Sequence, residues 1–329
     1  MAHSPEFEQV VLAYITPWNN RGYDVVKDFR GKFSHLSPVW YQLRPTHSSK
    51  GPAFALTGDH DVDQGWIKEV TEPVTPTHGP FAGSTITPKI VPRFVIEIQA
   101  REELEALVKD HSHADSVATL IVKECRKQKH SGFVLEFIYS GYTPYLIETL
   151  SAAAKQNKLQ FFLVIPPKHD GQEHILFDKP QFDLYKSLVN GFSLMTYDYS
   201  PNNHPGPNAP IEWVIANILR LCPEENPADR AKLLVGLNLY GNDYSENGHE
   251  SIVGKKYIEL LEAHEPALVW NKDVLEATFE YVDKKGDAHQ VWYPTKESIQ
   301  KRLEAFKALG TGVSLWEVGQ GLDYFYALF

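Results

Sequence analysis

Short apolar runs rich in β-branched residues recur along the chain, and amphipathic segments separate them. An apolar run without internal alternation is typical of a parallel strand that is covered on both faces. The pattern therefore predicts eight strands, over residues 10–15, 33–43, 89–96, 132–138, 160–165, 191–197, 233–240 and 312–316.

The segments between these strands carry apolar residues at spacings of three and four, the period of a helix with one buried face. Prolines stand near the start of three of them, where a helix does not need the missing N–H. The pattern predicts helices over residues 101–109, 115–127, 144–156, 180–188, 210–221 and 296–308. Strands that alternate with helices predict an α/β fold, here a closed (β/α)8 TIM barrel, with a doubly wound open sheet as the alternative.

One region departs from this alternation. Residues 255–264 are helical in pattern, and residues 277–294 are typical of a β-hairpin that turns at Lys284–Asp287. We therefore expect a single domain over residues 1–329, with a small α+β insertion at 255–294 between the seventh and eighth strands. The Pro-, Thr-, Ser- and Gly-rich stretch 44–89 predicts an exposed loop system.

Charge and composition exclude several classes of partner. The chain has 32 Lys and Arg against 42 Asp and Glu, a formal net charge of −10, which disfavours nucleic acid as the main partner. No apolar run reaches the roughly 18 to 20 residues of a membrane-spanning helix, so we expect no membrane insertion. The two cysteines, Cys125 and Cys222, are expected to be free thiols.

Patterns for metal binding are weak. Asp59, Asp61 and Asp63 are spaced as in a calcium loop, but Gln64 and Val70 replace the glycine and glutamate that such a loop needs. The chain also lacks the His and Cys spacings of zinc sites. We expect no metal and no cofactor, and a turn or packing role for the three aspartates.

Aromatic side chains gather at the predicted strand ends. In a (β/α)8 barrel ligands bind at the carboxyl ends of the strands. Rings with a few polar groups suit a sugar, because its apolar faces stack on rings while its hydroxyls form hydrogen bonds. Packing of some of these rings in the barrel core is the alternative. The candidate substrate-binding residues are Tyr14, Trp18, Trp40, Met195, Tyr197, Asp198, Tyr240 and Trp316.

Five motifs carry a family resemblance. "AYITPWN", "FSHLSPVW", "GFSLMTYDYS", "LLVGLNLYGNDYS" and "GVSLWE" occur in the order, and at the strand ends, found in family-18 glycoside hydrolases, the chitinase family. The chain therefore resembles that family over nearly its whole length. The resemblance implies a barrel, often with an α+β insertion after the seventh strand, and a cleft for chitin-like N-acetylated glycans. It also implies that Tyr197 and Asp198 hold the N-acetyl group and that Trp316 floors the pocket.

The catalytic motif of the family is degenerate here. Active members carry D-G-x-D-x-D-x-E on the fourth strand, and the last Glu is the proton donor; this chain has Ser131, Val134, Glu136 and Ile138 at the four acidic positions. We therefore expect no catalytic residue. Glu136 lies about 6 to 7 Å deeper than the missing acid, at roughly 3.3 Å per strand residue. Glu97 is the other candidate for a displaced acid.

The resemblance and these losses predict a chitinase-like, lectin-like protein that binds N-acetylated oligosaccharides such as chitooligosaccharides without hydrolysing them. Two alternatives remain open: an active glycoside hydrolase with a displaced acid at Glu97 or Glu136, and a scaffold that binds a receptor or another protein. For Glu317, which alternation directs away from the barrel interior, we expect a structural salt bridge. The resemblance also implies a secreted or lysosomal, endomembrane location.

Overall fold

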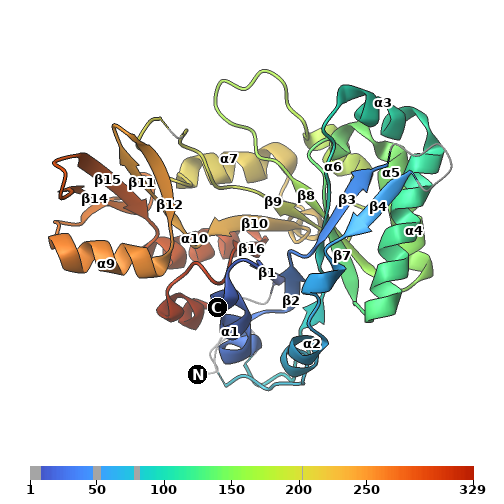
Figure 1. The fold of residues 1–329 in the computed structure, drawn as a ribbon, viewed down its shortest axis with the longest axis horizontal. Coiled ribbons are helices and arrows are strands. Elements are labelled where there is room, and N and C mark those ends of the chain that lie inside the picture. The colour runs from blue at the N-terminus through green and yellow to red at the C-terminus, as the bar shows by residue number, and fades with distance from the viewer. Residues whose placement is uncertain (1–8, 47–52, 78–81, 202) are drawn as a thin grey trace.

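Parallel strands surround a central axis, and helices cover their outer face (Figure 1). The computed structural model describes residues 9–46, 53–77, 82–201 and 203–329. Around the axis run β1 (Val11–Ile15), β2 (His35–Pro38), β5 (Lys89–Ile90), β7 (Gly132–Glu136), β8 (Gln160–Ile165), β9 (Gly191–Leu194), β10 (Leu233–Asn238) and β16 (Gly312–Trp316). Each of the eight predicted runs therefore contributes to the curled sheet.

The second and third predicted strands are bent. Residues 33–43 divide into β2 and β3 (Tyr41–Pro45), and residues 89–96 divide into β5 and β6 (Arg93–Ile96). Pro92, at the second bend, has no N–H to give to a strand ladder. Closure between β5 and β7 begins with the Ser131 backbone N–H, which donates to the Ile90 carbonyl at 2.8 Å.

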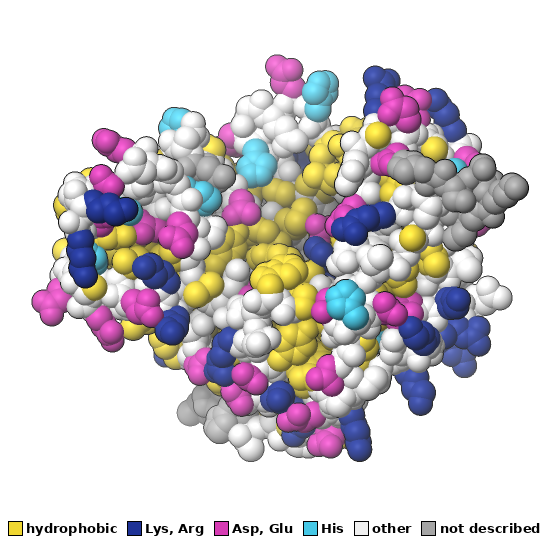
Figure 2. All heavy atoms as spheres, viewed as in Figure 1, with side chains coloured by type: hydrophobic (Ala, Val, Ile, Leu, Met, Phe, Trp, Pro, Cys, Tyr) yellow, Lys and Arg dark blue, Asp and Glu magenta, His cyan; other side chains and the backbone are white. Residues whose placement is uncertain are grey.

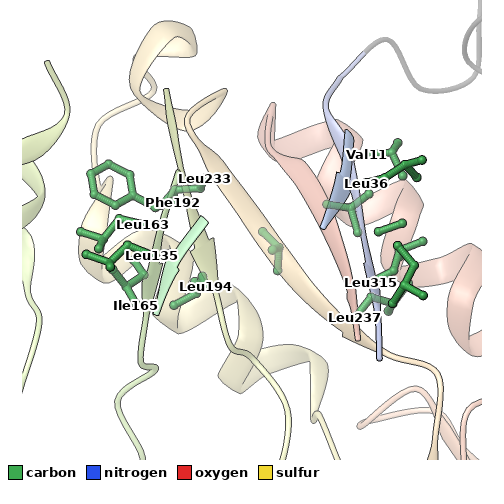
Figure 3. Close-up of a cluster of buried hydrophobic side chains, with 14 of the residues drawn as sticks. Val11, Leu36, Leu135, Leu163, Ile165, Phe192, Leu194, Leu233, Leu237 and Leu315 are labelled. Carbon is green, nitrogen blue, oxygen red and sulfur yellow. The ribbon is translucent and has the colours of Figure 1, made fainter. Parts of the chain in front are cut away.

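Two layers of apolar side chains hold the barrel together. Residues on the outer faces of the strands, among them Leu135, Leu163 and Phe192, form the main core (Figure 3). The covering helices are α3 (Arg101–Lys109), α4 (His111–Gln128), α5 (Pro144–Gln156), α6 (Lys179–Tyr185), α7 (Ile211–Leu221), α8 (Pro227–Arg230) and α10 (Lys296–Leu309). A smaller inner cluster fills the axis with Leu12, Tyr14, Val39, Val91, Val134, Phe162, Val164 and Leu234.

An antiparallel sheet follows β10. It consists of β11 (Gly241–Ser245), β12 (Gly248–Ile252), β13 (Val269–Asn271), β14 (Glu276–Val282) and β15 (Ala288–Tyr293), and α9 (Gly254–His264) lies between β12 and β13 in sequence. We call it the appended sheet. β14 and β15 pair antiparallel on either side of Lys284–Asp287, so the predicted hairpin is present. The pairing of β11 with β12 begins at Gly241, so the appended sheet starts before residue 255, the predicted start of the insertion.

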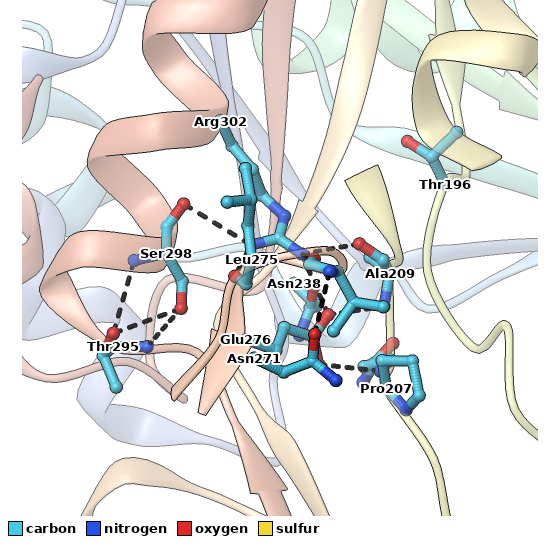
Figure 4. Close-up of polar contacts among 12 residues, drawn as sticks. Thr196, Pro207, Ala209, Asn238, Asn271, Leu275, Glu276, Thr295, Ser298 and Arg302 are labelled. Atoms are coloured by element: carbon cyan, nitrogen blue, oxygen red, sulfur yellow. Dashed lines mark hydrogen bonds and ion pairs between the residues drawn. The ribbon is translucent and has the colours of Figure 1, made fainter. Parts of the chain in front are cut away.

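A buried ion pair ties the appended sheet to the barrel (Figure 4). Arg302 of α10 donates from Nη2 to Glu276 Oε1 of β14 at 2.9 Å, and the two side chains are 2% and 1% exposed. The Glu276 carboxylate also accepts from the backbone N–H groups of Asn208 and Ala209, at 2.9 and 2.7 Å. Sheet, helix and the loop after β9 therefore meet at one carboxylate.

The prediction that 44–89 is an exposed loop system is wrong for much of its described part; residues 47–52 and 78–81 lie outside the described residues. β4 (Phe54–Thr57) pairs antiparallel with β3, and α2 (Gln64–Val70) follows it. Phe54 and Trp66 are buried in the main core. Asp63 caps α2 by accepting from the Trp66 backbone N–H at 2.9 Å. These elements are short, so their apolar residues gave no clear period.

Among the described residues, no helix is long and apolar enough to span a bilayer. Cys125 and Cys222 are buried free thiols, as expected.

Candidate functional site

Partly buried side chains at the carboxyl ends of two strands lie against the inner cluster of the barrel. Met195 and Trp316, from the ends of β9 and β16, pack against this cluster. Figure 2 shows hydrophobic side chains gathered in a depression at the centre of the molecule, which we call the hollow. Val134, at an acidic position of the family motif, is fully buried in the cluster. A dry apolar group therefore stands where the family resemblance implies a carboxylate.

Glu136 lies one step above Val134 on the same face of β7, because side chains alternate along a strand. Its Oε2 accepts from Arg93 Nη1 on the neighbouring strand β6 at 2.7 Å. The Glu136 side chain is 30% exposed and that of Arg93 is 12% exposed. Glu136 is thus an ion-paired carboxylate, and it has the partner that a partly buried charge requires.

Ile138 occupies the position of the family's proton donor and is 48% exposed. It lies beyond the end of β7, next to the short helix η3 (Ser140–Tyr142). A hydrocarbon side chain has no proton to transfer, so this position contributes only apolar contact.

Glu97 approaches the level of Ile138. Val95 pairs with Glu136 in the register of β6 and β7, and on the other side of β6 the Glu97 backbone N–H continues the ladder with β3 by donating to the Leu43 carbonyl at 3.0 Å. Glu97 therefore stands one strand away from the missing acid. Its Oε2 accepts from Arg44 Nε at 2.6 Å in a partly exposed pair. Glu97, like Glu136, is therefore an ion-paired carboxylate.

Tyr197 and Asp198 follow β9 at the rim. Tyr197 is half-buried, and burial raises its pKa well above the ordinary value, with further contributions from Tyr14 and the Glu136 and Asp198 carboxylates. It therefore remains a phenol that can donate a hydrogen bond. Asp198 is exposed and accepts from the hydroxyl of Tyr240. Burial, and then Asp198, raise the pKa of Tyr240 as well.

Asp198 adopts a left-handed backbone, with φ of 60°. Asn208 supports this conformation, because its Oδ1 accepts from the Asp198 backbone N–H at 2.7 Å. The Asn208 backbone is in turn held by Glu276. Asn208 therefore links the buried Glu276–Arg302 pair to Asp198 at the rim of the hollow.

Three aromatic residues surround the β16 end. Trp316 is half-buried; its ring centroid lies 6.4 Å from that of Tyr197, at an interplanar angle of 23°, and 5.2 Å from that of Tyr14. Tyr14 is only 2% exposed and donates to Ser193 Oγ at 2.9 Å, so it supports Trp316 from below. Trp18 is 70% exposed on the loop after β1.

Two expectations fail. Trp40 is completely buried, donates from Nε1 to the Tyr23 hydroxyl at 2.8 Å and packs against Trp66, so it does not line the hollow. Its strand bends there, which turns the ring into the core. Among the described residues Glu317 forms no salt bridge; it accepts from Asn19 Nδ2 at 2.5 Å and from the Gly319 backbone N–H at 2.9 Å.

Sequence reasoning missed Arg93 and Asn208. Arg93 stands alone between apolar residues, and its inward direction follows only from the register of β6 with β7. Asn208 is in an irregular loop, where no period indicates direction. The only sequence signal was that Asn208 lies within the stretch "PGPNAP", residues 205–210.

Comparison with known proteins defines the class. Residues 99–321 match the family model described as Glycosyl hydrolases family 18, which is more than half of the chain, so the chain belongs to that family. The family expected from the motifs is confirmed, and with it a (β/α)8 TIM-barrel-like fold.

Matching relatives include bacterial and plant proteins of modest identity. A cortical fragment-lytic enzyme of Bacillus subtilis (strain 168) is 23% identical over 231 residues, 65% of this chain and 52% of that enzyme. The chain spans 37% to 61% of the curated relatives it matches. A chitinase from Chromobacterium violaceum ATCC 12472 is 18% identical with a TM-score of 0.78, and 97% of each chain is covered. A chitinase from Cycas revoluta in complex with (GlcNAc)3 is 14% identical with a TM-score of 0.74, again covering 97% of each chain.

Proposed function

We propose that this chain recognises N-acetylglucosamine-containing oligosaccharides and does not hydrolyse them. One observation carries the proposal: the aromatic and polar side chains at the ends of β9 and β16 are assembled around the hollow, while the proton-donor position holds the exposed Ile138. A sugar ring stacked on Trp316 would lie within reach of Tyr197 and Asp198. The names of the relatives, a cortical fragment-lytic enzyme and a chitinase bound to (GlcNAc)3, support an amino-sugar glycan as the ligand.

We further propose that the chain belongs to a non-catalytic branch of the family. Its motifs "YITPWNNRGYDV", "HDVDQGW" and "WEVGQGLDYFY" resemble those of the stabilin-interacting chitinase-like protein. The relatives found by comparison are instead bacterial lytic enzymes and chitinases, so the branch rests on these motifs alone. A secreted or lysosomal location accompanies this branch as part of the proposal.

The test is calorimetric titration with N-acetylglucosamine oligomers of increasing length. Trp316→Ala should weaken binding by about 1 to 3 kcal/mol, the scale of losing a stacked ring, or roughly 5- to 150-fold. Trp270→Ala is the matched control, because Trp270 lies on β13 at the edge of the appended sheet. Equal affinity of wild type and Trp316→Ala would exclude Trp316 as the stacking platform.

A displaced acid is the second candidate function, and the level of Glu97 beside Ile138 favours Glu97 over Glu136. Prolonged incubation with the same oligomers and with peptidoglycan fragments, followed by mass spectrometry, separates the two functions. We expect intact oligomers. Product formation that disappears in Glu97→Gln and persists in Glu136→Gln would establish the hydrolase instead.

A scaffold function predicts a different pattern. A protein partner on the outer helices would bind equally well to wild type and Trp316→Ala, and a glycan array would show no signal. That combination would replace the glycan-recognition proposal.

A further inference from the structure

Glu317 connects the carboxyl ends of β1 and β16, the neighbouring strands that lead to Trp18 and Trp316. It follows Trp316 directly, at the end of β16, and is 1% exposed. Its Oε1 accepts from Asn19 Nδ2 at 2.5 Å, and Asn19 follows Trp18 directly. One hydrogen bond therefore joins the residues next to both tryptophans.

The surroundings of this carboxylate leave little freedom. Oε2 accepts from the Gly319 backbone N–H at 2.9 Å, and the Glu317 backbone N–H donates to Gln320 Oε1 at 3.1 Å. The first turn of α1 (Asn20–Asp28) packs so closely that a Cβ on Gly22 would lie 3.2 Å from Oε2. A Cβ on Gly319 would meet Asn19 Nδ2 at 2.5 Å. Asn19 is thus held between Glu317 and the backbone after β16.

Building on the proposed glycan recognition, we propose that Glu317 is a positioning residue of the cleft. Its hydrogen bond to Asn19 fixes the loop that carries Trp18 relative to Trp316, and this arrangement sets the affinity for the oligosaccharide. Glu317 does not touch the ligand in this arrangement, because it points away from the hollow and is buried.

The contact is sensitive to protonation. Burial raises the pKa of Glu317 to about 7, and the Gly319 and Asn19 donors lower it only in part. The groups that face it are Asn19 on the loop after β1, Gly22 on α1, and Tyr326 on η4 (Asp323–Leu328). Beside Tyr326, Arg21 of α1 and Asp323 of η4 form a partly exposed ion pair at 2.7 Å.

The direction of the pH effect follows from the donors. The ionised carboxylate accepts from both N–H groups, whereas a protonated carboxyl turns one oxygen into a donor that faces another donor. Protonation therefore weakens the contact with Asn19 or with Gly319. Affinity for the oligosaccharide should be highest above about pH 7 and fall on acidification.

The experiment measures the Kd for an N-acetylglucosamine oligomer at pH 8 and pH 5.5. We expect wild type to bind about 3- to 10-fold more weakly at pH 5.5. Glu317→Gln has an amide NH2 that is a donor at any pH, so it should show the low-pH affinity of wild type at both pH values. Asn19→Ala should weaken binding at pH 8 without abolishing it. Asp323→Asn removes a nearby carboxylate outside this contact and should behave as wild type.

Hydrogen exchange supplies a readout that needs no glycan. Corrected for intrinsic rates, the backbone amides of residues 18–22 should exchange faster in Glu317→Gln than in wild type at pH 8. Identical exchange and identical pH profiles of Kd in both proteins would refute the positioning role. Absence of glycan binding by wild type at both pH values, with the exchange difference intact, would instead refute the proposed function.

Discussion

The Glu276–Arg302 pair gives the sharpest stability prediction. Arg302→Met removes the guanidinium that neutralises a carboxylate only 1% exposed. The Nη1 and Nη2 atoms of Arg302 also donate to the carbonyls of Leu275, Ala209 and Val274, at 2.6, 2.5 and 3.2 Å, and these acceptors lose their partner. Breaking a buried pair in this way costs about 3 to 5 kcal/mol.

Urea and thermal unfolding measure this loss. At about 2 °C per kcal/mol for a chain of this size, Tm should fall by about 6 to 10 °C. The double variant Glu276→Leu/Arg302→Met leaves no unpaired charge, so it should lose at least about 1 kcal/mol less than the sum of the single variants. Glu280→Gln, an exposed position on the same strand, should stay within about 0.5 kcal/mol of wild type. A loss below about 1 kcal/mol for Arg302→Met, or strict additivity of the two changes, would contradict this account.

Three further predictions concern other sites. Ile138→Glu alone should produce no hydrolysis detectable by mass spectrometry, because Val134 and the Arg93-paired Glu136 still depart from the family motif; turnover would contradict this. Gly58→Ala should lower the unfolding free energy by about 1 to 3 kcal/mol in urea, because φ is 95° and the new Cβ would meet the Trp40 carbonyl; an unchanged midpoint would argue against it. Burial lowers the pKa of His130 to about 4. The contribution of neutral His130 to the free energy of unfolding is fully present above pH 6.5 and is lost, by up to about 3 kcal/mol, as pH falls through 4. His130→Gln should remove that part of the acid destabilisation.

Local patterns predicted the elements well where a single physical cause sets them. Apolar runs located the barrel strands because a strand covered on both faces must be apolar throughout. The bends after Pro38 and Ile90 escaped prediction, since the runs are apolar on both sides of each bend. Trp40 was misassigned for that reason: an aromatic residue at a bend can face either the cleft or the core.

For the site, the sequence predicted only the direction in which side chains point along a strand. The inward direction of Glu136 and the outward direction of Glu317 follow from period two along a strand. Their partners do not, because Arg93 and Asn19 come from 43 and 298 residues away in sequence. Which donor meets a buried carboxylate is decided by the register between elements, and that register is a property of the closed barrel.

Val134 makes the acidic motif of the family hard to restore in this chain. A carboxylate returned to this position would enter an anhydrous cluster, and the cation on the neighbouring strand, Arg93, is already committed to Glu136. A Val134→Asp change would thus weaken the fold, because it buries a charge without a partner. Packing along the barrel axis therefore limits which acidic residues of the family motif this chain can accommodate.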